Sequence, residues 1–113
     1  MNKNNTIEID PNIIYFTHSK LRKKFSDGKF VEDTLKEIID GNLKAEDLPT
    51  IKIMFDPTTE RYISMNNRRL YVYKQLSSLG KLKTISANLE YVKGKDNKLS
   101  KNTYSLTAKL EMK

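Results

Sequence analysis

Two adjacent arginines, Arg68 and Arg69, have the clearest capacity for chemistry, and they directly follow Asn66 and Asn67. The residues before this cluster alternate in a strand-like pattern, and the apolar spacing after it predicts a helix over residues 67–79. An arginine in the first turn of a helix lies beside unpaired N–H groups, which costs roughly 0.3–1 kcal/mol unless an anion is close. We therefore expect a negatively charged partner at this helix start.

Two kinds of partner would satisfy these arginines. One is a bound phosphate or another anion, which helix N-termini accept readily. The other is a carboxylate of the chain itself. The acids considered for this role are Asp56, Glu60, Glu32 and Asp33. Arginine forms bidentate contacts with both groups, so both interpretations stay open. The two asparagines are predicted to form a helix cap and a turn, because asparagine is a preferred N-cap residue.

Further cations lie ahead of the first predicted helix. Arg22 stands among several lysines, and Lys29 comes just before the helix, from where it could reach an anion. His18 has no acid close to it in sequence, which argues against a general-base role. The candidate binding residues are Arg22, Lys29, Asn66, Asn67, Arg68 and Arg69. We predict no catalytic residue.

Composition excludes several kinds of site. The chain has 113 residues, which fits a single domain over residues 1–113. It has no cysteine and one histidine, so disulfides, thiolate chemistry and clusters of Cys or His around a metal are excluded. No apolar run approaches the roughly 20 residues needed to span a bilayer. The polar N-terminus predicts no secretory signal, so we expect a cytoplasmic or nuclear protein with no membrane partner.

The net charge of +7 would suit binding to nucleic acid. Most of the cations are lysines scattered along the chain rather than gathered on one helix face. This distribution favours a solvated surface over a dedicated basic patch, while nucleic acid stays open as a partner.

Periodicity predicts an α+β fold, with a small mixed sheet and two main helices. Helices are predicted over 30–39 and 67–79, and strands over 7–9, 13–16, 51–55, 61–65, 85–91 and 104–112. The strands at 51–55 and 61–65 should form a hairpin. The last two strands should form a terminal antiparallel hairpin around the polar loop 93–102, and residues 1–6 are predicted to be disordered.

The order of these elements and the cluster at 66–69 resemble the ParB/sulfiredoxin-like fold family over about residues 9–92. Sulfiredoxins carry Gly-Cys-His-Arg at this strand–helix junction, and ParB proteins carry Gly-Glu-Arg-Arg. The flanking residues are similar too, with Tyr62 and Ser64 ahead and the run 73–76 behind. The passage from a helix through Leu48 and Pro49 into a strand also resembles the family.

This resemblance implies a site for a nucleotide, ATP or CTP, with Mg²⁺. Arg22 matches the sulfiredoxin arginine that helps to hold the ATP phosphates. Asn67 stands where sulfiredoxins have their nucleophilic Cys and ParB proteins their Glu, and Arg68 replaces the sulfiredoxin His. An amide is no nucleophile, which argues against sulfinic acid reduction and puts nucleotide hydrolysis in doubt. The DNA-reading domain that follows this fold in ParB proteins has no space in this chain.

Three functions fit the sequence. The favoured one is a non-catalytic domain that binds a nucleotide or another phosphate compound at the 66–69 helix start. The second is a nucleotide-dependent phosphotransferase or hydrolase that uses an acid such as Asp33 or Glu37. The third is a basic nucleic-acid-binding or protein-adaptor module, which would keep the fold as a scaffold.

Overall fold

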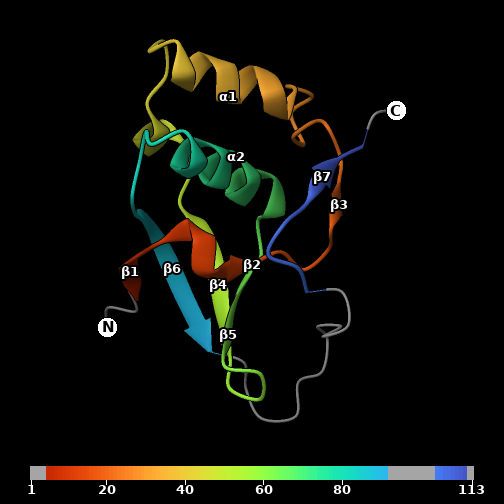
Figure 1. Ribbon diagram of the computed structural model, residues 1–113, viewed down its shortest axis with the longest axis vertical. Helices are drawn as coiled ribbons and strands as arrows, with labels where there is room; N and C mark the ends of the chain where they lie inside the picture. Colours follow the sequence, from red (N-terminus) through yellow and green to blue (C-terminus); the bar gives the residue numbers. More distant parts are fainter. Residues whose placement is uncertain (1–4, 92–103, 112–113) are drawn as a thin grey trace.

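The computed structural model describes residues 5–91 and 104–111, and within them it has two α-helices and a mixed five-stranded sheet (Figure 1). The helices are α1, Val31–Ile39, and α2, Asn67–Ser78, with short 3-10 helices η1, Pro11–Ile13, and η2, Ala45–Asp47. The strands are β1, Thr6–Ile9, β2, Ile14–Tyr15, β3, Lys20–Leu21, β4, Ile51–Asp56, β5, Arg61–Ser64, β6, Ile85–Tyr91, and β7, Lys109–Leu110. The predicted α+β class is confirmed.

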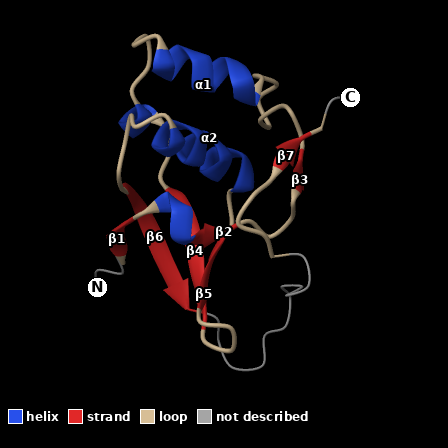
Figure 2. Ribbon diagram, in the orientation of Figure 1, coloured by secondary structure: helices blue, strands red, loops and turns tan. Residues whose placement is uncertain are grey.

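The main sheet has the strand order β1-β6-β4-β5-β2, and it mixes both directions (Figure 2). β1 pairs with β6 and β4 with β5 in antiparallel fashion, whereas β4 with β6 and β2 with β5 are parallel. The predicted hairpin at 51–65 is therefore confirmed. β3 and β7 form a separate two-stranded parallel sheet.

Helix α2 lies between the sheet and α1, and it is buried on two sides (Figure 1). Leu70 and Tyr73 belong to the cluster formed with the strands. Val72 and Leu76 pack instead with Val31 of α1. Because both faces of the first three turns are covered, the position of α2 is fixed from two directions, and so is the helix start that carries the arginines.

The predicted apolar stripes extend too far at the C-terminal end of each helix. Leu79 was expected on the buried face of α2 and Ile39 on that of α1, but they are 55% and 38% exposed. Leu79 already lies beyond the last helical residue, where the chain turns away. Gly41 and Gly80 follow with φ of 85° and 74°, a left-handed conformation that glycine adopts without strain, so both helices end where the glycines predict.

The predicted terminal hairpin is wrong. Both sides of β6 are occupied, by β1 and by β4. The described residues 104–111 instead run beside residues 16–21, where Phe16 and Ser105 exchange backbone hydrogen bonds of 2.7 and 3.0 Å. Further along, β7 lies parallel to β3. The predicted loop 93–102 is outside the described residues.

Order at the N-terminus starts earlier than predicted. Thr6 belongs to β1, and the Asn5 carbonyl accepts a hydrogen bond of 3.0 Å from the Leu89 N–H. Residues 1–4 are outside the described residues. Within residues 5–91 and 104–111, neither helix has the length and apolar character that a membrane crossing requires.

Candidate functional site

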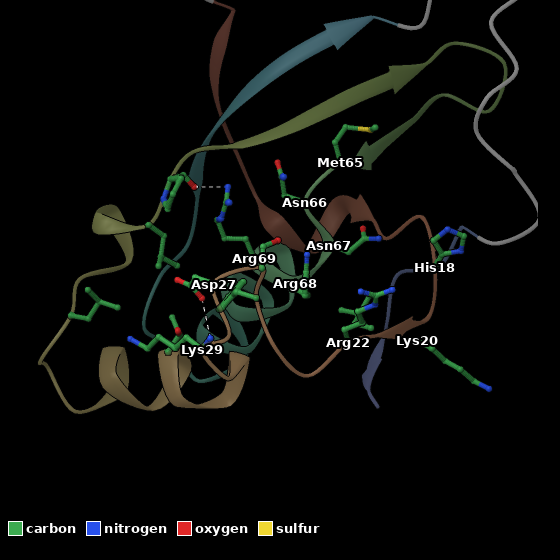
Figure 3. A pocket seen from close by; sticks show the side chains of 17 residues that line it. His18, Lys20, Arg22, Asp27, Lys29, Met65, Asn66, Asn67, Arg68 and Arg69 are labelled. Atoms are coloured by element: carbon green, nitrogen blue, oxygen red, sulfur yellow. Dashed lines mark hydrogen bonds between the residues drawn. The ribbon is translucent and has the colours of Figure 1, made fainter. Parts of the chain in front are cut away.

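A cavity of about 690 Å³ lies at the junction between β5 and α2 (Figure 3). Three stretches form it: residues 18–34, which lead into α1, residues 43–49, and residues 65–69. All of the candidate binding residues line this cavity, namely Arg22, Lys29, Asn66, Asn67, Arg68 and Arg69. The fold therefore brings together the side chains that the sequence singled out, from two segments more than 35 residues apart.

The charge of the lining is strongly unbalanced. Its cations are Lys20, Arg22, Lys29, Arg68 and Arg69, and its one carboxylate is Asp27. Figure 3 shows Arg22 on the segment that follows His18 and Lys20, and Arg68 and Arg69 at the start of α2. Arg22 forms no hydrogen bond or ion pair with another described residue. Such an excess of positive charge attracts anions.

Backbone carbonyls, not carboxylates, hold the two arginines of α2. Nη1 of Arg68 donates to the carbonyl of Lys24 at 2.5 Å. Nη1 of Arg69 donates to the carbonyls of Pro49 and Thr50 at 3.0 and 3.3 Å. Neither arginine has an ion pair with a carboxylate among residues 5–91 and 104–111. Of the two partners considered from sequence, internal carboxylates are not the ones observed. The carbonyls orient the guanidinium groups but leave their full charge in place.

The start of α2 is open, which differs from the predicted asparagine cap. Asn66 occupies the N-cap position, but its Oδ1 accepts from the Lys52 N–H at 2.8 Å and caps nothing. The first N–H of α2 with a helical acceptor is that of Leu70, which donates to the Asn66 carbonyl. Among the described residues, the N–H groups of Asn67, Arg68 and Arg69 have no acceptor. These three donors add a partial positive charge beside the cavity.

Asn67 fastens α2 to the loop that leads into β3. Its Nδ2 donates to Oγ1 of Thr17 at 2.6 Å, and its Oδ1 accepts from the Thr17 N–H at 3.2 Å. The loop held in this way continues into Lys20 and Arg22. Asn67 is therefore a positioning residue for the cations on the other side of the cavity.

Lys29 is the one predicted binding residue with a compensated charge. Its Nζ lies 2.7 Å from Oε1 of Glu37, and both side chains are about 40% exposed. Its N–H donates to Oδ1 of Asp27 at 3.0 Å. Neither Glu37 nor Asp33, the acids considered for catalysis, is part of the cavity lining. The described residues contain no group of three or more His, Asp or Glu arranged to hold a metal ion.

Lys74 has the most strongly altered side-chain pKa of the described residues, and it lies outside this cavity. Its Nζ is 5.0 Å from the centre of the Phe16 ring and donates to the Leu106 carbonyl at 2.8 Å. Burial lowers the pKa of Lys74 to about 8, against an opposing effect of Asp10. The lysine fastens the C-terminal segment to α2.

No family model matches this chain, and no curated protein or solved structure matches it either. The assignment of the cavity therefore rests on its geometry and chemistry.

Sequence reasoning missed five polar residues of the cavity, His18, Lys20, Ser26, Asp27 and Thr34. Lys20 was interpreted as a solvated neighbour of Arg22. The closeness of Lys20 to Arg22 in the sequence was the signal that could have identified it as a cavity residue. Which lysines of this segment face the cavity depends on how the segment folds back toward α2. Lys23 and Lys24, in the same segment, lie over the Phe30 ring instead, at 5.9 and 4.9 Å.

Proposed function

We propose that this domain binds a phosphate-bearing small molecule, a nucleotide, in the cavity at the start of α2, and that it does so without catalysis. The observation that carries the proposal is the unneutralised charge of Arg68 and Arg69, which point their carbonyl-bound guanidinium groups toward a cavity with one carboxylate. A phosphate is the ligand chemistry that such a site recognises best, because its oxygens accept from guanidinium and from free helical N–H groups alike.

The size and the apolar part of the cavity favour a nucleotide over inorganic phosphate. A volume of about 690 Å³ falls within the usual range of small-molecule sites, about 300–1,000 Å³. Leu21, Phe25, Pro49 and Met65 supply apolar surface next to the cations. This surface would suit a base or ribose while the arginines bind the phosphates.

The cavity residues also fit a nucleotide that arrives with Mg²⁺. Protein sites for this ion commonly offer one or two carboxylates and leave the remaining positions to phosphates and water. Asp27 is the carboxylate that could take this role. Bound Mg²⁺ would offset part of the phosphate charge, and the arginines and the α2 N–H groups would bind the rest.

We also propose that the chain is a divergent member of the ParB/sulfiredoxin-like fold family. The support is the mixed sheet with two helices on one face, together with a cavity at the junction where the family motif would fall. Asn67, at the position of the family's Cys or Glu, is occupied with Thr17, which supports binding rather than chemistry.

The basic-surface alternative has less support. Several exposed lysines already have local partners: Lys29 pairs with Glu37, Lys52 with Glu90 at 3.4 Å, and Lys24 lies over Phe30. A nucleic-acid surface would need a continuous row of uncompensated cations. Four cations without an ion pair to a described carboxylate, Lys20, Arg22, Arg68 and Arg69, lie together in the lining of the cavity.

Calorimetric titration with ATP, CTP and GTP, each with and without Mg²⁺, tests the proposal. We expect binding that weakens roughly tenfold to 100-fold in Arg68→Ala, because a hydrogen bond to a charged group contributes about 1.5–3 kcal/mol. Lys36→Ala is the matched control, since it removes one positive charge from an exposed position of α1 outside the cavity. Equal loss of affinity in both variants, or no binding of any phosphate compound, would contradict the proposal. Turnover of the nucleotide would favour the enzyme alternative, and a steep salt dependence of oligonucleotide binding would favour the nucleic-acid one.

A further inference from the structure

A second hollow, of about 790 Å³, lies on the other side of the segment that closes the first cavity. Leu43 and Leu48 line both spaces, so the stretch around η2 is a shared wall. The remaining walls come from the end of α1, the C-terminal half of α2 and the start of β6. None of the six candidate phosphate-binding residues lines this second hollow.

The chemistry of the two spaces differs. Around the second hollow the cations Lys44 and Lys81 are balanced by the acids Glu8 and Glu46. Glu8 also accepts hydrogen bonds from Thr84 and Ser86, which lowers its pKa and keeps it ionised. The space therefore has no net charge that would select an anion.

The most informative residue of the second hollow is Tyr73. Its side chain is buried, with 4% exposure, and it lines the hollow together with the buried Leu76 and Ile85. Its hydroxyl has no hydrogen-bond partner among the described residues. Among the described residues, Thr59 Oγ1 is the side-chain polar atom that is both fully enclosed and unpaired. The Tyr73 hydroxyl is unpaired but not fully enclosed, so it contacts open space. A tyrosine hydroxyl at such depth normally has a partner.

We propose that this hollow is a second ligand site, which binds an uncharged small molecule with a ring-sized apolar body and one neutral acceptor, a carbonyl oxygen or a ring nitrogen, for the Tyr73 hydroxyl. The apolar floor binds the body of the ligand, and the hydroxyl fixes its orientation. Burial raises the pKa of Tyr73, with a smaller contribution from Glu46 and an opposing one from Arg69, so at neutral pH the hydroxyl is a donor. This is why the ligand must offer an acceptor.

The proposal is independent of nucleotide binding in the first cavity. It rests on Tyr73 and on an apolar floor that the first cavity does not share. Arg68→Ala removes a side chain that is bonded to the Lys24 carbonyl and does not line the second hollow, so it would leave these features in place. Either proposal can therefore fail while the other holds.

Amide chemical-shift titrations with acetophenone and with ethylbenzene test the inference. The two probes have the same ring, and only acetophenone offers a carbonyl acceptor. We expect millimolar acetophenone to shift the amides of Gly80, Lys81 and Ala45, which line the second hollow, and ethylbenzene to bind the same place more weakly. Tyr73→Phe should lower acetophenone affinity about threefold to tenfold and leave ethylbenzene affinity unchanged. Tyr71→Phe is the matched control, because Tyr71 lies on the same helix and does not line the hollow.

Three results would overturn the inference. One is the absence of shifts at these amides, which would mean that the hollow holds water only. Another is equal binding of the two probes to the unmodified protein, a comparison that needs no variant. The third is an equal loss of acetophenone affinity in Tyr73→Phe and Tyr71→Phe.

Discussion

Replacing Asn67 by aspartate should separate the role of this residue in stability from its role beside a bound anion. The change keeps the shape of the side chain. The Thr17 N–H would still donate to Oδ1, and the Thr17 hydroxyl, which now accepts from Nδ2 at 2.6 Å, could rotate to donate to a carboxylate oxygen. The contacts that hold the loop should therefore survive in Asn67→Asp.

The added negative charge should act in opposite directions on folding and on binding. In the first turn of α2 it faces unpaired N–H groups and two arginines, so we expect the free energy of unfolding to rise by about 0.3–1 kcal/mol. For a bound phosphate the same charge is repulsive. At a separation of roughly 6–8 Å and an effective dielectric constant of roughly 20–40, the repulsion between the carboxylate and the nearest phosphate charge would cost about 1–3 kcal/mol. Nucleotide affinity should fall about tenfold to 100-fold.

Urea denaturation and calorimetric titration with ATP, both at the same ionic strength, would measure the two effects. Asn5→Asp adds the same charge at an exposed position away from the cavity and should change neither quantity appreciably. Asn67→Ala removes both contacts with Thr17 and should destabilise the fold by about 1–2 kcal/mol. If Asn67→Asp binds ATP as tightly as the unmodified protein, or loses as much stability as Asn67→Ala, the reasoning about this site is refuted.

Three further variants extend these tests. Glu37→Gln breaks the 2.7 Å ion pair with Lys29. Both side chains are about 40% exposed, so denaturation should show a stability change below about 0.5 kcal/mol. Titration should show ATP binding about twofold to threefold tighter, because the charge of Lys29 is then no longer compensated. Arg69→Gln loses its bond to the Pro49 carbonyl and should lower the urea-derived stability by about 1 kcal/mol; no loss would mean that this bond does not hold the wall. The pKa of Lys74 is lower in the folded than in the unfolded state, so the folded state binds fewer protons between about pH 8 and 10.5. The free energy of unfolding of the unmodified protein, relative to that of Lys74→Met, should rise by about 1 kcal/mol over this range, after allowance for partial exposure. Parallel plots of the free energy of unfolding against pH for the two proteins would contradict this.

The parts of the site that could be predicted are those set by local sequence. The strand before residue 66 and the helix after it follow from periodicity, and they bring four of the six candidate residues into one junction. The predicted Asn66 cap is wrong for a reason that the local sequence does not show. The Lys52 N–H, on a neighbouring strand, takes the oxygen that would otherwise cap α2. Asn66 Oδ1 thus accepts from a backbone N–H of β4 instead of an N–H in the first turn of α2.

The partners of the arginines could not be predicted either. Backbone carbonyls such as that of Lys24 have no signature in the sequence, whereas carboxylates do, so sequence reasoning weighed only the visible candidates. The same limit explains the C-terminal error. An alternating pattern over 104–112 predicts an extended segment but does not say which strand edge it will meet. Both edges of β6 were already paired with β1 and β4, and β7 pairs with β3 instead.

The way in which the arginines are held has a consequence for the ligand. Arg68 connects α2 to the segment ahead of α1, and Arg69 connects it to the wall around η2. A carboxylate in either place would have formed the same connection and cancelled the charge. With carbonyls as partners, each connection stays cationic, and each guanidinium group keeps further N–H donors for a phosphate. An anion bound there would contact all three segments that form the cavity through these side chains. Ligand binding should therefore stabilise the arrangement of the segments as well as occupy the space between them.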